Sequence, residues 1–230
     1  MMTINNRGHM ITIIGVYAPN EGTNFQKKEK YENSLREILD KIPDRHEIIL
    51  AGDLKSRVGK QKSNPIVSPH GEETVNRNGE KLIDVCREHK LQIMNTYFAH
   101  KNIHKHTWHK DARNRKSIID YYIVRQNSNL KIHDVRVKRG AKCSSDHYLV
   151  QAKIYVPYRH QPGQNTKENH NVTRLKCLLL KKSILLLHQR FETEGILRLE
   201  LSNSVHISED NSSRADARRD GPSDKVGWET

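Results

Sequence analysis

Residues 47–53 read Glu47-Ile48-Ile49-Leu50-Ala51-Gly52-Asp53, a run of apolar residues that leads into an aspartate. The short apolar run is typical of a buried strand, and it ends on a glycine and an aspartate. A strand of this kind fixes the carboxylate of Asp53 at a loop edge that is open to solvent and substrate. Gly52 lets the backbone turn there and lets a phosphate approach closely. We therefore expect an α/β sheet with chemistry at the carboxyl end of this strand.

The elements around this strand alternate between strand and helix. A helical pattern covers Asn24–Ile42, and a second helix opens at Asn78-Gly79. Between them, residues 55–74 form a loop with Pro65 and Pro69. Further strands are predicted at Met10–Tyr17, Leu91–Met94, Ser117–Val124, Ile132–Val137 and His147–Val156. Because hairpin-like neighbours appear late in the chain, the pattern indicates mixed sheets with helices on the outside.

The composition divides the chain near residue 160, at Pro157 and Pro162-Gly163. We expect one domain over residues 1–157, a linker with an amphipathic helix over 158–201, and a disordered tail over 202–230. Hydrophobic residues make up 34% of the chain and the mean hydropathy is −0.84, which agrees with a partly unpacked chain.

The net charge is +13, and it is concentrated in the first domain. Of the 40 Lys and Arg residues, 28 lie in residues 1–158, with 17 of the 27 Asp and Glu residues. A polyanionic partner follows, with nucleic acid (DNA) ahead of an acidic membrane surface. The alternative is a solvated basic surface with no partner.

The three cysteines, Cys86, Cys143 and Cys177, are widely spaced and form no Cys-x-x-Cys pair. We therefore expect no disulfide partner and an intracellular setting, nuclear or cytoplasmic. The amino terminus has no apolar signal core, and no apolar run approaches the length of a membrane span. The sequence does not fix the oligomeric state.

Ser145-Asp146-His147 runs directly into the apolar Tyr148-Leu149-Val150. Asp146 could hold a metal or a phosphate while His147 pairs with the reacting oxygen. Asp120 lies in the middle of a predicted strand, where a carboxylate is unfavourable unless it is paired, and a histidine is its natural partner. The alternative for each aspartate is a turn cap or a surface charge.

A histidine cluster, His100, His104, His106 and His109, invites a zinc interpretation, but its spacing fits no standard zinc site. The neighbouring cations instead favour a basic loop that faces DNA. These cations are Lys101, Lys105, Lys110, Arg113, Arg115 and Lys116, followed by Lys138, Arg139 and Lys142.

Seven motifs occur in order over about residues 10–156. They are Tyr17-Ala18-Pro19, Gly52-Asp53-Leu54, Asn78-Gly79, Leu91–Thr96, Thr107-Trp108, Ile119-Asp120-Tyr121 and Ser145-Asp146-His147. In this order the chain resembles the endonuclease/exonuclease/phosphatase superfamily. The resemblance is greatest to the endonuclease of RTE-type non-LTR retrotransposons and to the host relatives called craniofacial development protein 2.

This resemblance implies a four-layer α/β sandwich and cleavage of DNA phosphodiesters with Mg²⁺, or Mn²⁺ as an alternative. It implies that Asp53 orients or deprotonates the attacking water, that His147 contacts the scissile phosphate, and that Asp120 holds the imidazole. Tyr17 would donate a hydrogen bond near the phosphate, and Asp146 would hold the metal. With the basic loops it gives a substrate-binding set of Lys55, Asn95, Thr107, Trp108, Arg115 and Lys142.

Two departures from the family pattern bear on activity. Family members carry an asparagine two places after the aspartate, where this chain has Lys55. Lys55 could pair with Asp53 and compete with metal, or it could contact phosphate directly. The earlier family strands, which carry an asparagine and a metal-binding glutamate, have no counterpart before Met10, so we expect a sandwich that is incomplete at the amino terminus.

Three functions follow from these residues. The first is a retrotransposon-derived, Mg²⁺-dependent DNA endonuclease whose activity is impaired by Lys55 and by the truncation. The second is a catalytically inactive nucleic-acid-binding remnant. The third, a phosphatase of small phosphates or lipids, fits the basic domain less well.

Overall fold

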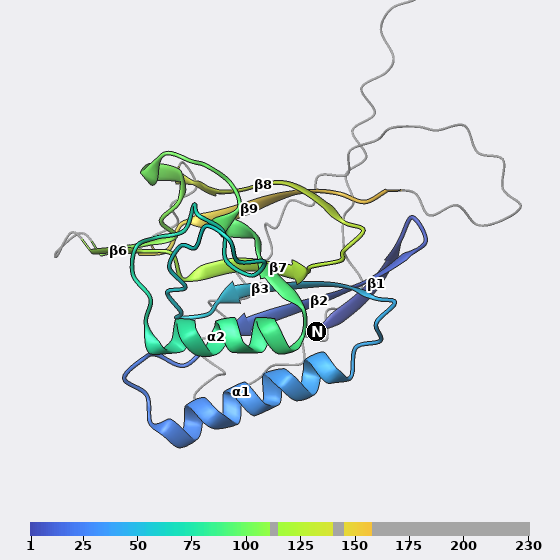
Figure 1. Cartoon of the computed structure of the whole chain (residues 1–230), viewed down its shortest axis with the longest axis horizontal. Coiled ribbons are helices and arrows are strands. Elements are labelled where there is room, and N and C mark those ends of the chain that lie inside the picture. The colour runs from blue at the N-terminus through green and yellow to red at the C-terminus, as the bar shows by residue number, and fades with distance from the viewer. Residues whose placement is uncertain (111–114, 140–144, 158–230) are drawn as a thin grey trace, which may run out of the picture.

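The structure is a computed structural model, and it describes residues 1–110, 115–139 and 145–157 (Figure 1). The expected linker and tail lie outside the described residues, as do Arg113, Lys142, Cys143 and Cys177. Cys86, within the described part, is buried and has a free thiol.

A five-stranded mixed sheet is the centre of the molecule. Its strands are β1 (Met2–Asn6), β2 (His9–Tyr17), β3 (Glu47–Asp53), β4 (Leu91–Ile93) and β7 (Asp120–Arg125). Their order is β1-β2-β3-β7-β4, and only the β2–β3 pair is parallel. Two antiparallel pairs complete the strands: β5 (Trp108–Lys110) with β6 (Arg115–Ser117), and β8 (Lys131–Lys138) with β9 (Leu149–Tyr155).

Two helices cover one face of this sheet, α1 (Phe25–Asp40) and α2 (Arg77–Glu88) (Figure 1). The side chain of Asn24 accepts a hydrogen bond from the amide of Gln26 and caps α1. The expected start of α2 at Asn78 was slightly late. The side chain of Asn76 accepts from the amide of Gly79 and so caps the helix two residues earlier.

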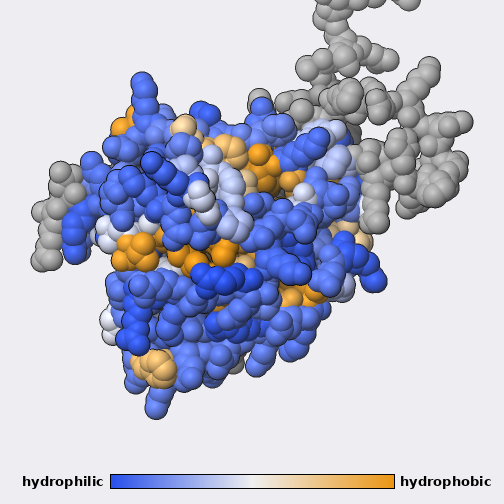
Figure 2. All heavy atoms as spheres, in the orientation of Figure 1, coloured by the Kyte–Doolittle hydropathy of each residue, from blue (hydrophilic) through white to orange (hydrophobic). Residues whose placement is uncertain are grey.

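The predicted α/β architecture is confirmed, and the described residues form three of its layers: helices, five-stranded sheet and β8–β9 sheet (Figure 1). Every residue of β3 is buried because this strand has a core on each face. Ile48 and Leu50 pack with the helices, whereas Ile49 and Ala51 pack toward β8 and β9. On the face in Figure 2, hydrophilic residues cover most of the surface and hydrophobic residues form small groups.

One strand was not predicted, and the prediction of another was wrong. The missed strand, β1, precedes Met10 and forms a hairpin with β2 through Arg7 and Gly8, which have φ of 52° and 80°. Its polar, alternating sequence lacks the apolar run by which the other strands were recognised. The expected strand at Ser117–Val124 is also interrupted, and Asp120 is the first residue of β7 rather than its middle.

The interruption before β7 has a visible cause. The amide of Ile118 donates to the carboxylate of Glu72, and the amide of Ile119 donates to the hydroxyl of Thr107. Since these amides bond to side chains instead of a neighbouring strand, the sheet ladder stops and restarts at Asp120.

Gly52 permits the closest approach between β2 and β3. Its φ is +151°, and a Cβ atom built there would lie 1.9 Å from the carbonyl oxygen of Val16. Glycine is the one residue that fits this position, as the sequence predicted for the turn into Asp53.

None of the helices in the described part of the chain combines the length and hydrophobicity that a membrane span requires.

Candidate active site at the carboxyl ends of β2 and β3

Three side chains meet at one edge of the five-stranded sheet because of strand register. The parallel β2–β3 pair aligns Tyr17 with Asp53, and the antiparallel β3–β7 pair aligns Asp53 with Asp120. Residues aligned in neighbouring strands point to the same face, here the face toward β8 and β9. The arrowheads of β2 and β3 point to this edge, on the side of β6 in Figure 1.

His147 reaches the same edge from the segment before β9. This segment is attached by the main chain to the start of β5: the amide of His109 donates to the carbonyl of Asp146 at 2.9 Å, and the amide of Tyr148 donates to Thr107 at 2.8 Å. The hydroxyl of Thr107 in turn accepts from the amides of Ile119 and Asp120, at 3.0 and 3.1 Å. Thr107 therefore joins the Asp120 and His147 segments.

The expected pairing of Asp120 with a histidine is present. The Nδ1 atom of His147 lies 3.0 Å from Oδ2 and 3.2 Å from Oδ1 of Asp120, and Nε2 lies 3.6 Å from Oδ2 of Asp53. Because an ionised carboxylate only accepts, Nδ1 carries the hydrogen and donates it to Asp120. The pairing fixes the orientation of the ring and leaves Nε2 toward Asp53.

The environment shifts the pKa of both catalytic candidates. Asp53 is 2% exposed, and its burial, together with the negative charge of Asp120, raises its pKa to about 6, against the opposing effect of Lys55. Burial alone would lower the pKa of His147. The hydrogen bond and charge of Asp120 outweigh it, with a contribution from Asp53, so that the pKa of His147 lies above its usual value.

Lys55 is paired with Asp53. Its Nζ lies 2.6 Å from Oδ2 of Asp53 and 5.2 Å from the centre of the Tyr17 ring, while its amide donates to Oδ1 at 3.1 Å. Burial alone would lower the pKa of Lys55, but the charge and hydrogen bond of Asp53 outweigh it, so that this pKa lies above its usual value. The expected ion pair with Asp53 is therefore present, and a direct contact of Lys55 with phosphate stays a prediction.

Asn95 and Thr107, both expected to bind substrate, bond to the main chain of β7. The amide group of Asn95 donates to the carbonyl of Asp120 at 3.1 Å, and its oxygen accepts from the amide of Tyr122 at 2.8 Å. These bonds position Asp120, and a direct contact of either residue with substrate stays a prediction.

Trp108 and Asp146 are bonded to each other, with 2.7 Å between the indole nitrogen and Oδ2 of Asp146. This carboxylate does not join Asp53 and Asp120 as a potential ligand, so its role in holding a metal stays a prediction. Arg115 lies exposed in β6, and Lys142 is outside the described residues.

Asp53, Asp120 and His147 form the group within the described residues that could hold a metal. Each offers one ligand atom, and these atoms lie within 4.8 Å of one another. Carboxylate oxygens suit Mg²⁺, and oxygens with an imidazole suit Mn²⁺ as well, so the donor set fits a divalent cation in its chemistry. Oδ2 of Asp53 is at the same time bound to the Lys55 ammonium.

The histidine cluster does not come together. His100 bonds to Asp134 at 2.7 Å, His104 lies 3.2 Å from the carbonyl of Val137, and His106 lies 3.0 Å from that of Asn102. In the described part of the chain these histidines belong to no group that could bind a metal, which contradicts the zinc interpretation.

Sequence reasoning missed two supports of the site. Asn76 and Asn78 donate to the carbonyl of Lys55 at 3.4 and 3.3 Å and hold the turn that follows β3. Glu72, which is buried, accepts from Arg57 and from the amide of Ile118. The helix-capping signal could have identified Asn76, whereas nothing local in the sequence pointed to Glu72.

Comparisons with known proteins identify a family and several relatives. The family model described as endonuclease-reverse transcriptase matches residues 11–151. Craniofacial development protein 2 from Tragulus javanicus is 29% identical over 163 residues, which is 69% of this chain and 28% of that protein. The Bos taurus protein is 29% identical over 178 residues, 75% of this chain and 30% of that protein. The chain thus spans less than a third of the length of these curated relatives.

The solved structures that match part of the chain include two from Neisseria. A 3′-5′ exonuclease from Neisseria meningitidis has a TM-score of 0.44 and 21% identity, over 61% of this chain and 59% of that one. A 3′ phosphatase from Neisseria, bound to a product DNA hairpin, has a TM-score of 0.45 and 18% identity, over 64% and 62%.

Proposed function

This chain belongs to the endonuclease-reverse transcriptase family, within the endonuclease/exonuclease/phosphatase superfamily, and we propose that its site cleaves phosphodiesters of DNA with a divalent metal. Mg²⁺ is the proposed metal, with Mn²⁺ as the alternative. We also propose that the domain descends from a non-LTR retrotransposon, which the description of its family supports.

One observation carries the proposal: Asp53, His147 and Asp120 form a connected row, with Nδ1 of His147 on Asp120 and Nε2 toward Asp53. A buried carboxylate beside an imidazole that is oriented by a second carboxylate can move a proton at a defined place. A row of this kind is what hydrolysis by an activated water requires.

The chemistry divides between the two ends of the row. With a pKa of about 6, Asp53 is ionised at neutral pH and can accept a proton from an attacking water. His147, with its raised pKa, can carry a positive charge and donate from Nε2 to a phosphate oxygen. A divalent ion held by carboxylate oxygens of Asp53 and Asp120 would supply further stabilisation of the charge on the phosphate.

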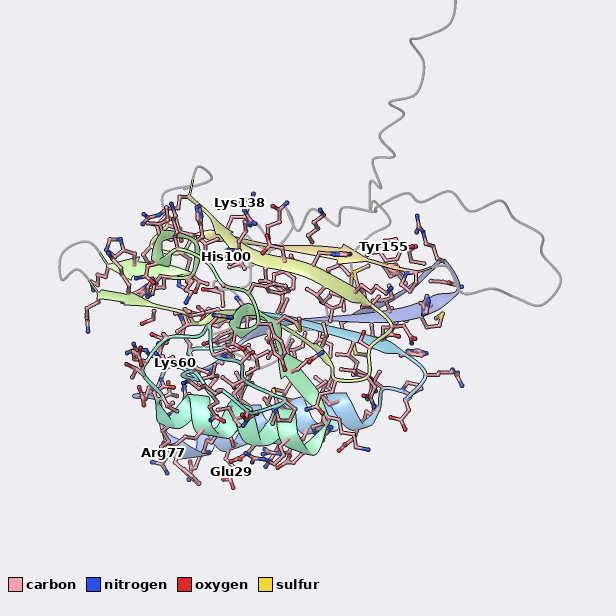
Figure 3. The ribbon with its side chains drawn as sticks, turned by 45° about the horizontal axis from the view of Figure 1, so that its top comes forward. Glu29, Lys60, Arg77, His100, Lys138 and Tyr155 are labelled. Carbon is pink, nitrogen blue, oxygen red and sulfur yellow. The ribbon has the colours of Figure 1, made fainter. Side chains whose placement is uncertain are left out.

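The basic surface near the site supports a nucleic acid as substrate. Arg115 and Lys116 are exposed on β6, which pairs with the strand that holds Trp108. Lys138 lies at the end of β8 on the same side of the molecule as His100, and away from Tyr155 of β9 (Figure 3). Cations placed in this way can track a phosphate backbone.

A second candidate is a domain that binds nucleic acid and cleaves it slowly or not at all. The ion pair between Lys55 and Asp53 favours it, because an ammonium at 2.6 Å reduces both the basicity of Asp53 and its availability to a metal. The basic surface is common to both candidates.

Nicking of supercoiled plasmid in Mg²⁺ tests the proposal, with His147→Ala and Lys55→Asn variants beside the parent chain. We expect nicking that His147→Ala abolishes and Lys55→Asn increases. No nicking by the parent or by Lys55→Asn, with DNA binding retained, would support the binding domain instead. Release of phosphate from a small phosphomonoester without nicking would point to a phosphatase.

A further inference from the structure

We propose that Lys55 is the resident cation of this site: its ammonium holds the oxygen of Asp53 that a divalent metal would need, so a metal binds only when Lys55 leaves. The inference deepens the proposed function and rests on it, because the catalytic role of the metal belongs to that proposal. Its test, however, measures metal binding without any nucleic acid.

The oxygens of both carboxylates are already engaged. Lys55 contacts both oxygens of Asp53: its Nζ lies 2.6 Å from Oδ2, and its main-chain amide donates to Oδ1 at 3.1 Å. Nδ1 of His147 lies 3.0 and 3.2 Å from the two carboxylate oxygens of Asp120. A metal that uses Oδ2 of Asp53 therefore meets the ammonium at the same oxygen, and repulsion between the two cations favours displacement of Lys55.

The turn that carries Lys55 is held in place. Its φ is +47°, a left-handed conformation that residues other than glycine and asparagine adopt rarely. The side chains of Asn76 and Asn78 donate to its carbonyl, and the Tyr17 ring faces its ammonium. These contacts keep the lysine over Asp53 rather than in solvent.

Charge and burial make the competition strong. The two carboxylates carry two negative charges, and the ammonium offsets one of them. The side chain of Asp53 is 3% exposed and that of Lys55 is 17% exposed, so water and salt screen the pair weakly. A divalent ion would meet a positive charge at the same oxygen, which weakens its binding.

An ammonium also cannot replace what a divalent ion does for a bound water. It offsets negative charge and donates hydrogen bonds, but it is no Lewis acid that makes a hydroxide at neutral pH. The identity of residue 55 therefore controls whether this site is loaded with metal.

Titration of Mn²⁺ into the protein, followed by calorimetry or by the electron paramagnetic resonance of free Mn²⁺, tests this inference. The variants are Lys55→Asn, which suits the left-handed turn, and Lys55→Met, which keeps the aliphatic stem. Both should bind Mn²⁺ at least about tenfold more tightly than the parent, from the loss of one nearby positive charge. The control is Lys81→Met, which removes a lysine paired with Glu32 at 2.7 Å in another part of the structure and should match the parent.

Two further measurements keep the outcome clear. First, Mn²⁺ should raise the melting temperature of Lys55→Asn and leave that of the parent nearly unchanged. Second, adding Asp53→Asn to Lys55→Met should abolish the increase in Mn²⁺ affinity that Lys55→Met produces. Equal Mn²⁺ affinity in the parent and both Lys55 variants would overturn the inference, as would a gain that persists without Asp53. An inactive parent whose Lys55 variants bind metal tightly but do not nick would contradict the proposed function alone.

Discussion

Asp53 and Asp120 are direct partners across the antiparallel β3–β7 pair. The two carboxylates therefore point to the same face and share one histidine, which contacts Asp120 through Nδ1 and faces Asp53 through Nε2. The charge of Asp120 raises the pKa of both Asp53 and His147, and Asp53 contributes to the raised pKa of His147.

Replacing Asp120 should lower the pKa of His147. Asp120→Asn removes the charge and the carboxylate acceptor that raise this pKa, and leaves the burial that lowers it. The pH titration of the His147 ring by NMR measures the shift. The matched control is Asp134→Asn, because Asp134 pairs with His100 and should leave the pKa of His147 unchanged. An unchanged His147 titration in Asp120→Asn would show that the pairing is absent in solution.

Asp53 should make the stability of the domain fall as the pH rises from about 4 to about 6. Its pKa in the folded state is about 6, against 3.8 as the ordinary value, so the folded state holds the proton more tightly than the unfolded state in this window. Below the window this contribution is fully present, and it is lost as the pH passes the folded pKa.

Urea unfolding of the parent and Asp53→Asn at pH 4.5 and 6.5 measures this contribution. The free energy of unfolding of the parent should drop relative to that of Asp53→Asn by on the order of 1–3 kcal/mol between the two values. Parallel changes in the two proteins would contradict the raised pKa.

Gly52→Ala should unfold or strongly destabilise the domain, by about 3 kcal/mol or more. The added Cβ would lie 1.9 Å from the carbonyl oxygen of Val16, and the φ of +151° disfavours any side chain. Gly22→Ala is the control, since a Cβ there meets nothing within 4 Å. Urea unfolding followed by circular dichroism compares the two, and equal stabilities would mean that β2 and β3 approach less closely than described.

Neutralising the cations of β6 should weaken DNA binding independently of sequence. Arg115→Gln with Lys116→Gln removes two exposed charges from the strand that pairs with β5. The slope of affinity against salt should fall by about one unit for each cation that no longer neutralises a phosphate. Fluorescence anisotropy of a labelled oligonucleotide over a salt series measures both effects. Lys30→Gln, on the exposed side of α1, should leave the affinity unchanged, and an equal loss there would mean that the whole surface binds DNA non-specifically.

Much of the fold could be predicted because its signals are local. The apolar run at Ile48–Ala51 and the apolar face of Asn24–Ile42 mark β3 and α1 on their own. A histidine partner for Asp120 was also predictable, since a carboxylate in a strand needs a partner, and the family resemblance implied that this histidine is His147. The hairpin of β1 was missed because its alternating polar residues lack an apolar run.

Other features depend on contacts between distant segments. The break before Asp120 comes from Thr107 and Glu72, which lie far away in the sequence. The ion pair of Lys55 with Asp53 likewise depends on the turn held by Asn76 and Asn78. Strand register and side-chain bonds of this kind are set only when the chain is folded.

The attachment of the His147 segment to Thr107 makes the geometry of the site depend on how the two sheets pack together. Asp53 and Asp120 belong to the central sheet, whereas His147 leads directly into β9 of the opposite layer. A slide of one layer over the other that broke the bonds of Thr107 to these two segments would separate Nδ1 from Asp120 while each sheet kept its own ladder. A ligand that binds both the central-sheet carboxylates and His147 would oppose that slide and raise the midpoint temperature of unfolding of the whole domain.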